Sequence, residues 1–259
     1  MEAGQGLWSK SAIDYGTVKH SMLSLISLTF DDGFRCQFDQ ALPVLKTHGI
    51  PATFFLIANQ EPTHEGRKNE WWKIDWRDED LAMLKKAVQE GHEIGSHSVT
   101  HDETKMPEQP EFEARESKRR IESWMGIEIS SFCYPYYHSH LYLGDAVRNA
   151  GYRQARMGAQ NSYYALSAPL DFNLDCRQVS KHDDVKEWIR PDHWHVLTFH
   201  GIGDEHSGWE PIPLDRFVAM ATELVKYRDS KCLELVTFKE GAERFRQPPA
   251  QSSASLEKD

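Results

Sequence analysis

The stretch that decides the fold is Ser24-Leu25-Ile26-Ser27-Leu28-Thr29-Phe30-Asp31-Asp32-Gly33. A run of apolar and β-prone residues ends abruptly in two carboxylates and a glycine, which predicts a buried strand that delivers acids at its C-terminal end. Two adjacent acids repel each other unless a cation or a shared proton separates them, so the pair predicts two different roles, one ligand and one base. On its own, an Asp-Asp-Gly sequence after a strand is more typical of a turn.

A second polar segment predicts a metal site. Residues 91–101, Gly-His-Glu-Ile-Gly-Ser-His-Ser-Val-Thr-His, form a short strand pattern that runs into a loop with His97 and His101. Two imidazoles four residues apart and one carboxylate from another strand end make a ligand set that leaves positions open for water and substrate. Such an open set is typical of a catalytic metal site. Because the chain has 13 histidines, chance spacing on a solvated helix is the alternative.

These two segments resemble the first two motifs of a known family. Residues 28–33 (Leu-Thr-Phe-Asp-Asp-Gly) and 97–101 (His-Ser-Val-Thr-His) are similar to those of the polysaccharide deacetylases, the NodB-homology family of metal-dependent carbohydrate esterases. Residues 49–55 (Gly-Ile-Pro-Ala-Thr-Phe-Phe) and 91–95 extend the resemblance, which covers residues 24 to 240. It implies an α/β fold, a distorted and incomplete (β/α) barrel of the NodB-homology type.

Strand and helix patterns alternate along the chain, which predicts a parallel sheet with its polar motifs at the C-terminal ends of the strands. The residues alone do not distinguish a closed barrel from an open sheet. The span 171–179 is expected to be irregular. Strands are predicted over 23–30, 52–57, 91–96, 129–134, 152–155, 195–199 and 233–237, and helices over 36–48, 79–90, 108–125, 142–150, 183–189, 214–227 and 239–244. The charges of helix 108–125 are expected to form a solvated face.

Composition predicts one domain. A chain of 259 residues with 39% hydrophobic content can bury one large core. We expect a lead-in segment over 1–22, the deacetylase-like domain over 23–246 and a disordered tail over 247–259. The net charge of −10, without any basic run, argues against nucleic acid or an anionic membrane as a partner.

The cysteines and the N-terminus add two expectations. The four cysteines lie far apart with no Cys-x-x-Cys pair, so free thiols are predicted at Cys36, Cys133, Cys176 and Cys232. Residues 1–20 lack the apolar core of a signal peptide, and no stretch approaches a membrane-spanning length, so no membrane insertion is predicted. Many members of the resembling family are secreted, so localisation stays open between the cytoplasm and export with a removed signal. The sequence predicts no oligomeric state.

A third motif carries a departure from the family. Residues 132–136, Phe-Cys-Tyr-Pro-Tyr, align with a motif in which Pro135 and Tyr136 would shape the substrate-binding wall and the Tyr136 backbone N–H would hold an oxyanion. A plain strand-to-turn proline is the alternative. Many members have an arginine where this chain has Cys133. We predict that Arg156, at the end of the next strand, supplies that cation, and that Cys133 is a small buried filler rather than a nucleophile.

A strand that ends in histidine resembles the last family motif. The resemblance assigns His200, at the end of 195–200, as the general acid that protonates the leaving group. A cationic imidazole requires an acidic partner. Asp175 is the best candidate for that partner, while Asp171 and Asp183 are left open.

Tryptophans in two segments of the chain are candidates for sugar stacking. Trp72, close to Trp71 and Trp76, is assigned to a substrate-binding wall, and Trp209 in the Gly-rich loop 201–211 to a stacking platform. Ordinary packing of the first three and a surface loop with one anchored aromatic are the alternatives.

The expected chemistry is metal-assisted hydrolysis. Asp32, His97 and His101 would hold a divalent ion, for which zinc is the first choice and cobalt or nickel also fit, and Asp31 would take the proton of the attacking water. The expected substrate is an acetylated carbohydrate, and the expected reaction is N-deacetylation of an acetylated amino sugar. Three alternatives remain: an O-acetyl esterase of the xylan type, a cyclic-amide hydrolase of the same fold, and a carbohydrate-binding module that retains the metal residues.

Overall fold

The computed structural model describes residues 23–59, 73–136, 139–159, 164–165, 172 and 174–246. The expected lead-in and tail therefore lie outside the described residues.

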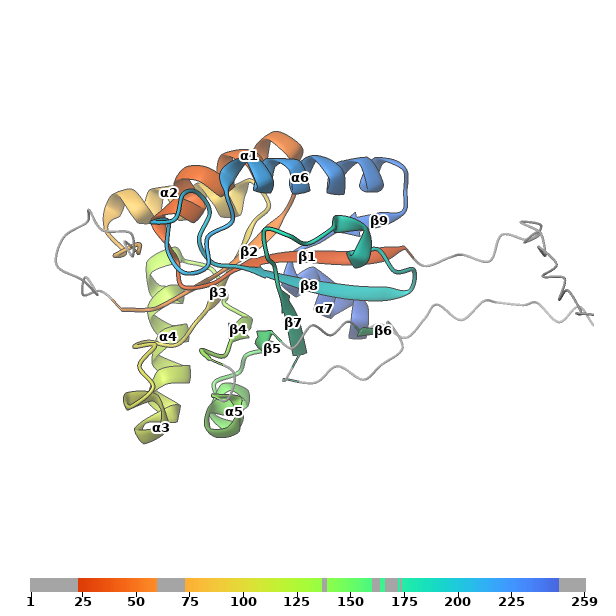
Figure 1. The fold of residues 1–259 in the computed structure, drawn as a ribbon. Coiled ribbons are helices and arrows are strands. Elements are labelled where there is room, and N and C mark those ends of the chain that lie inside the picture. The colour runs from red at the N-terminus through yellow and green to blue at the C-terminus, as the bar shows by residue number, and fades with distance from the viewer. Residues whose placement is uncertain are drawn as a thin grey trace, which may run out of the picture.

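Seven parallel strands form a closed ring (Figure 1). The ring closes because β8 pairs with β1 over six positions, from Leu25 opposite Trp194 to Phe30 opposite Phe199. The expectation of a distorted, incomplete (β/α) barrel is confirmed, with seven strands in place of the eight of a complete barrel. In ring order the strands are β1 (Ser24–Phe30), β2 (Ala52–Leu56), β3 (Glu93–Ser96), β4 (Ser131–Cys133), β5 (Gln154–Ala159), β7 (Leu174–Gln178) and β8 (His193–Phe199).

Two short strands extend the sheet at the ring. Strand β9 (Leu233–Leu235) pairs in parallel with the first half of β1, and β6 (Tyr164–Ala165) pairs antiparallel with β8. Since β2 pairs with the second half of β1, β9 and β2 share one edge of that strand.

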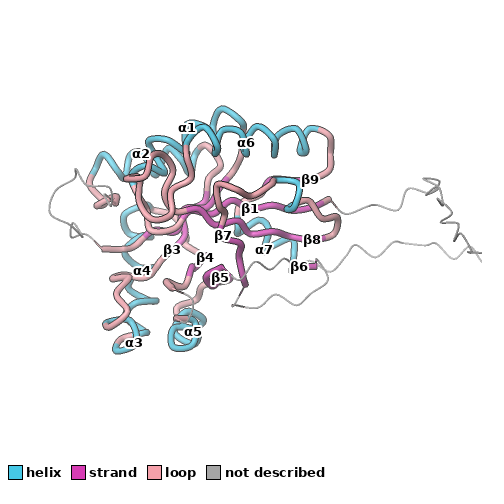
Figure 2. The backbone as a smooth tube through the Cα atoms, in the orientation of Figure 1, coloured by secondary structure: helices cyan, strands magenta, loops and turns pink. Residues whose placement is uncertain are grey.

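Helices surround the strands (Figure 2). Helices α1 and α6 lie side by side over one part of the ring, and α4 and α5 pack together over another (Figure 1). No helix in the described ranges is long and apolar enough to cross a membrane. The helical segments are η1 (Gln37–Ala41, a π-helix), α1 (Leu42–His48), α2 (Asp78–Gln89), α3 (Lys105–Glu108), α4 (Pro110–Met125), α5 (His140–Asn149), η2 (Val185–Trp188, a 3₁₀-helix), α6 (Leu214–Asp229) and α7 (Phe238–Arg246).

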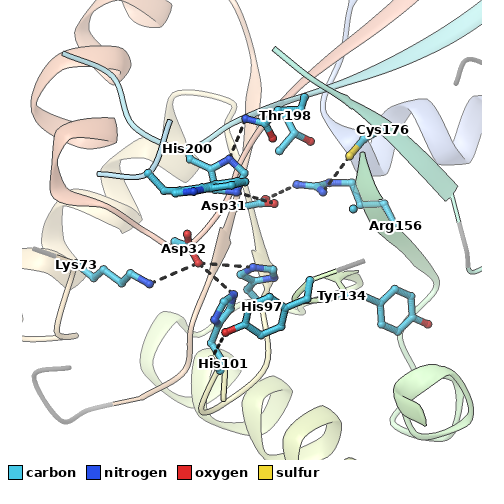
Figure 3. A pocket seen from close by; sticks show the side chains of 14 residues that line it. Asp31, Asp32, Lys73, His97, His101, Tyr134, Arg156, Cys176, Thr198 and His200 are labelled. Atoms are coloured by element: carbon cyan, nitrogen blue, oxygen red, sulfur yellow. Dashed lines mark hydrogen bonds and ion pairs between the residues drawn. The ribbon is translucent and has the colours of Figure 1, made fainter. Parts of the chain in front are cut away.

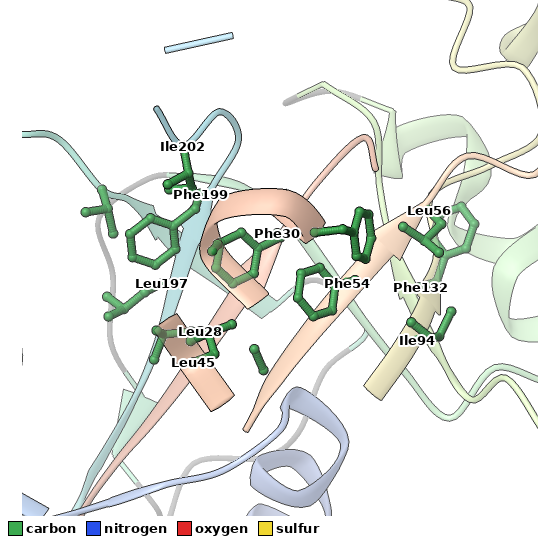
Figure 4. Close-up of a cluster of buried hydrophobic side chains, with 14 of the residues drawn as sticks. Leu28, Phe30, Leu45, Phe54, Leu56, Ile94, Phe132, Leu197, Phe199 and Ile202 are labelled. Carbon is green, nitrogen blue, oxygen red and sulfur yellow. The ribbon is translucent and has the colours of Figure 1, made fainter. Parts of the chain in front are cut away.

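Alternation along the strands separates an outer core from the barrel interior. In β1, Ile26, Leu28 and Phe30 pack outward, where the Phe30 ring lies 5.0 Å from that of Phe54 (Figure 4). Because successive side chains of a strand point to opposite faces, Asp31, which follows Phe30, points into the barrel. Within the barrel, a smaller apolar cluster includes Phe238 and other residues of α7, which therefore packs against the N-terminal end of the ring.

One prediction about local structure is wrong, and one helix differs in its type. The span expected to be irregular contains β7. Only one face of this strand lines the barrel, so charged and polar residues on its other face obscure the strand pattern in the sequence. The helix predicted over 36–48 is present, but it begins as the π-helix η1 before α1, and Pro43, which has no N–H to donate, lies in the first turn of α1.

Candidate active site

A cavity of about 430 Å³ opens at the C-terminal ends of the strands (Figure 3). Active sites of α/β barrels lie at this end because the loops that follow the strands converge there. The cavity is lined by residues of β5, β7 and β8 and of the segments that follow β1, β2, β3, β4 and β8: Asp31, Asp32, Lys73, His97, His101, Tyr134, Tyr136, Arg156, Gly158, Cys176, Gln178, Thr198, His200 and Trp209.

The three predicted metal ligands converge in this cavity. Asp32 Oδ1 lies 3.3 Å from His101 Nε2 and 3.8 Å from His97 Nε2. A tetrahedral ion with bonds of about 2.0–2.1 Å places its ligands about 3.3 Å apart, which is the distance between Asp32 and His101 and 0.5 Å less than that between Asp32 and His97. Asp32 Oδ1 is buried and accepts no hydrogen bond from the described residues, as a ligand oxygen would. The donor set therefore fits a divalent ion.

Both imidazoles are suited to ligation. His97 Nδ1 lies 2.8 Å from the Cys133 carbonyl oxygen, and with the proton on Nδ1 the ring keeps Nε2 free for a metal. Burial lowers the pKa of His97, and burial together with His97 lowers the pKa of His101 to about 4. Neutral imidazole is the form that binds a metal ion.

A buried carboxylate holds the loop between the two histidines. Glu113 of α4 accepts hydrogen bonds from Val99 N (2.7 Å), Thr100 N (2.9 Å) and Thr100 Oγ1 (2.7 Å). Its exposed fraction is 0%, so the prediction of a solvated charged face is wrong at this position. A sequence pattern does not separate one buried acid from the other charges of this helix.

The backbone is bent where the site residues lie. Asp32 (φ 72°), Ser98 (φ 69°), His101 (φ 51°) and Tyr136 (φ 56°) all adopt left-handed conformations. Such angles are unfavourable for residues other than glycine and gather at functional sites, where surrounding contacts enforce them. The bends turn residues of three different loops toward one cavity.

Asp31 is paired with Arg156. The guanidinium forms an ion pair with Asp31 Oδ1 and lies 4.8 Å from the Phe55 ring centroid. Arg156 on β5 is the register partner of Cys133 on β4. The cation that many family members place on one strand thus reaches the carboxylate from the neighbouring strand. Burial opposes the charge of Arg156, but Asp31 outweighs it and raises the arginine pKa.

The cysteines are free thiols, as predicted. Cys133 is 1% exposed, with Sγ 3.5 Å from Asp31 Oδ2, and burial raises its pKa well above the ordinary value. It also groups with Asp31 and His97 within metal-ligand spacing. A thiol kept protonated is a poor ligand, so the set with Asp32 is the better metal site.

His200 faces Asp31 but not Asp175. Its Nε2 lies 4.0 Å from Asp31 Oδ2, and its Nδ1 lies 3.3 Å from Gln178 Nε2. On β7, Cys176 and Gln178 line the cavity, so Asp175, one residue before Cys176, points away from it, and its carboxylate accepts the Cys176 N–H (2.8 Å). The assignment of Asp175 as the partner of His200 is therefore wrong. Burial lowers the pKa of His200, against the opposing effect of Asp31 and Asp32.

Neither of the other two candidate acids, Asp183 and Asp171, is observed as a partner of His200 among the described residues. Asp183 accepts the Ser180 N–H (3.1 Å) and pairs with Arg177 (3.2 Å), and Asp171 lies outside the described residues.

Gln37, a residue that the sequence did not single out, connects the C-terminal ends of β1 and β8. Its amide donates to the carbonyl oxygens of Asp31 (2.5 Å) and His200 (2.8 Å).

The predicted substrate-binding residues divide into two groups. Tyr136 and Trp209 line the cavity and are 39% and 43% exposed, and the Trp209 ring stands at 89° to His200 with centroids 4.5 Å apart. Pro135 is buried and does not line the cavity, so its placement in the substrate wall is wrong, and its fixed φ instead shapes the turn before Tyr136. Trp72 lies outside the described residues.

Residues 22–155 match the family model described as polysaccharide deacetylase. The chain belongs to the polysaccharide deacetylase family. YxkH of Bacillus subtilis, whose name places it among polysaccharide deacetylases, is 29% identical over 112 residues, which are 42% of this chain and 36% of that protein. The chitooligosaccharide deacetylase of a Bradyrhizobium species is 36% identical over 90 residues, 34% of this chain and 32% of that protein. The chain thus matches about a third of the length of these relatives.

Two solved structures share the fold. The Xyl-CE4 domain of a multidomain xylanase from the hindgut metagenome of Trinervitermes trinervoides superposes with a TM-score of 0.53 at 18% identity, covering 87% of this chain and 92% of that one. A family 4 acetyl xylan esterase from Clostridium thermocellum, solved with a cobalt ion, gives 0.51 at 19% identity, with coverage of 84% and 89%. At this identity the likeness shows the barrel fold alone.

Proposed function

We propose that the protein is a metal-dependent hydrolase that removes acetyl groups from a carbohydrate. One observation carries the proposal: Asp32, His97 and His101 converge within metal-ligand spacing beside the paired Asp31 and Arg156, in one cavity at the C-terminal face of the barrel. Neither a binding module nor a structural barrel requires a buried carboxylate with its own cation next to an open ligand set.

Asp32, His97 and His101 would hold the divalent ion. Zinc fits two imidazoles and one carboxylate, and the cobalt ion in the Clostridium thermocellum structure supports a second choice. When bound, such an ion polarises the acetyl carbonyl and lowers the pKa of a nearby water from about 15.7 toward about 7.

The remaining steps belong to the chain itself. Asp31 accepts the proton of the attacking water, and the ion pair with Arg156 orients its carboxylate. The Tyr136 backbone N–H donates to the oxyanion that develops on the acetyl oxygen. His200, on the other side of Asp31, gives its Nε2 proton to the leaving amine or alcohol. The amide of Gln178 at Nδ1 orients the ring.

For the substrate we propose N-deacetylation of an acetylated amino sugar. The chitooligosaccharide deacetylase relative supports this choice. O-deacetylation of xylan is the second candidate, and the fold shared with an acetyl xylan esterase supports it.

The test combines metal content with acetate release. The purified protein is assayed for bound metal and for acetate from N- and O-acetylated oligosaccharides, before and after chelation. We expect about one ion per chain, acetate only in the presence of metal, and an Asp31→Asn variant that retains metal but loses turnover. If the metal-loaded protein releases acetate from no acetylated sugar, the proposal is wrong, and turnover of a cyclic amide by the same sample would identify the alternative.

A further inference from the structure

A second cavity lies at the end of the barrel opposite the active site. Its volume is about 470 Å³, and it opens where β3 and β4 begin. The mechanism above uses none of the residues around it. They belong to α2 and the turn after it, the start of β3, the segment between α4 and β4, and the start of α7: Val88, Gly91, His92, Glu93, Ile94, Ile127, Glu128, Ser130, Thr237, Lys239, Glu240 and Glu243.

His92 provides a hydrogen-bond donor in the wall of this cavity. The residue is 5% exposed, and its Nδ1 accepts the Ala52 N–H (3.2 Å). A ring nitrogen that accepts a hydrogen bond carries no proton, so the proton of this imidazole is on Nε2. Among the residues that the structure describes, none accepts a hydrogen bond from Nε2. Nε2 is not enclosed by protein atoms, so this donor opens into the cavity that His92 lines.

The cavity also contains a carboxylate that the fold does not use. Three of its four glutamates have partners: Glu93 and Glu240 accept backbone N–H groups at the start of α7 (both 2.9 Å), and Glu128 pairs with Arg153 (2.9 Å). The fourth, Glu243, has no hydrogen bond or ion pair to any described residue and is half-buried. Its charge is therefore available to a cation.

These groups narrow the chemistry of a ligand. In the described part of the chain, both side-chain groups with metal-ligand spacing lie in the active site, so this cavity is not arranged for a metal ion. Its carboxylates repel an anion. A ligand that contacts both Glu243 and His92 Nε2 needs an ammonium and a hydroxyl oxygen. The volume suits a molecule the size of a sugar, and the half-buried Val88 and Ile127 offer contact to its C–H groups.

We propose that this second cavity binds a hexosamine with a free amine, whose ammonium contacts Glu243 and whose hydroxyl accepts from His92 Nε2. The inference goes beyond the proposed function and does not depend on it, although N-deacetylation would produce such an amine. Because the two cavities lie at opposite ends of the barrel, a bound amino sugar leaves the active site open.

The first test compares three ligands by calorimetry with zinc-loaded protein, at a pH of about 6.5, where the amine is protonated. Glucosamine has both groups, glucose lacks the ammonium, and n-butylamine lacks the hydroxyls. We expect glucosamine to bind about tenfold more tightly than either, because charge-assisted and neutral hydrogen bonds both contribute. Its advantage over glucose should fall with added salt. Equal affinity for glucose or for n-butylamine would overturn the proposal.

Amide chemical shifts locate the bound sugar. We expect glucosamine to shift the resonances of Gly91, Ser130 and Glu243, which line the second cavity. Shifts confined to His200 and its neighbours would place the sugar in the active site and reject the proposal.

Variants assign the affinity to the two side chains. Glu243→Gln should weaken glucosamine binding about five- to tenfold. His92→Asn, whose side-chain oxygen can still accept the Ala52 N–H, should weaken it about three- to tenfold. Glu111→Gln, at an exposed residue of α4 far from the cavity, should match wild type.

The outcomes separate this site from the deacetylase. Thermal melting checks folding, and Glu243→Gln alone decides if His92→Asn does not fold. Wild-type affinity in folded Glu243→Gln, or an equal loss in Glu111→Gln, would overturn the proposal. Both cavity variants should release acetate as wild type does, whereas glucosamine binding by a protein that releases no acetate would reject the deacetylase function and leave this site intact.

Discussion

At the scale of single residues, adjacent acids differ because the chain turns between them. Asp31 continues the alternation of β1, points into the barrel and pairs with Arg156. Asp32 has a φ of 72°, and its side chain turns toward Lys73 and the histidines. Burial raises the pKa of Asp32, but Lys73 and the surrounding imidazoles outweigh it, and the pKa lies below its usual range. Each acid thus lies beside its own cation, which permits one to act as a base and the other as a ligand.

The arginine that pairs with the base lies on β5 here, whereas many family members have it at the position of Cys133 on β4. We therefore predict that an arginine at position 133 can compensate for the loss of Arg156. Arg156→Ser should lower kcat about 100-fold or more, because it removes a buried electrostatic partner of the base. Adding Cys133→Arg should restore at least tenfold of this loss, since Cys133 is the register partner of Arg156 and its Sγ lies 3.5 Å from Asp31. Steady-state kinetics measures both effects, thermal melting monitors folding, and Arg153→Ser, at an exposed arginine just before β5, is the control. A folded double variant that is no faster than Arg156→Ser would contradict the prediction.

At the scale of elements, helix α4 positions the metal loop. Its Glu113 side chain bonds to the two residues just before His101, and its Ser117 hydroxyl contacts that of Ser96 (2.9 Å) at the end of β3. The helix therefore fixes both the strand that leads to His97 and the loop that follows. Supporting shells of this kind orient metal ligands without touching the metal.

Removal of the Glu113 charge should weaken metal binding. We expect Glu113→Gln to reduce metal affinity by about 10- to 100-fold, because an amide cannot accept all three hydrogen bonds of the loop. Competition with a chromogenic chelator measures this affinity. Glu111→Gln, two residues away on the exposed face of α4, should match wild type, and an unchanged affinity in Glu113→Gln would show that the loop holds its shape unaided.

At the scale of the whole molecule, closure of the ring by β8 against β1 brings the two ends of the catalytic machinery together. Asp31 and His200 both follow these strands, and Gln37 bonds to the carbonyl oxygens of both. Because β8 is buried on both faces, its outward side chains include a 4% exposed histidine, His195. Burial first, then Arg190 and His193, lower the pKa of His195 to about 4.

This buried histidine predicts loss of stability in mild acid. The unfolded chain protonates His195 near pH 6.5 and the folded chain only near 4, so unfolding binds a proton between these values and stability falls as pH decreases through that window. The loss from this group should approach about 2 kcal/mol at pH 5. Urea unfolding at pH 7.5 and 5.0, with chelator present, measures it. His195→Gln should flatten the pH dependence, whereas replacement of the exposed His206 by Gln should not, and equal slopes in all three proteins would refute the assignment.

The sequence by itself determined the order of the strands and helices apart from β7, together with the acid pair, the two histidines and the arginine that contacts Asp31. These features depend on local periodicity and on strand ends, which neighbouring residues encode. Only the tertiary structure decided that seven strands close the ring, that Gln178 rather than Asp175 faces His200, and that Lys73 and Glu113 belong to the site. Those contacts join segments far apart in the chain. The contact of Gln178 depends on the register of β7 and on which of its faces points inward, that of Lys73 on the left-handed turn at Asp32, and that of Glu113 on the packing of α4. None of these can be read from residue type alone.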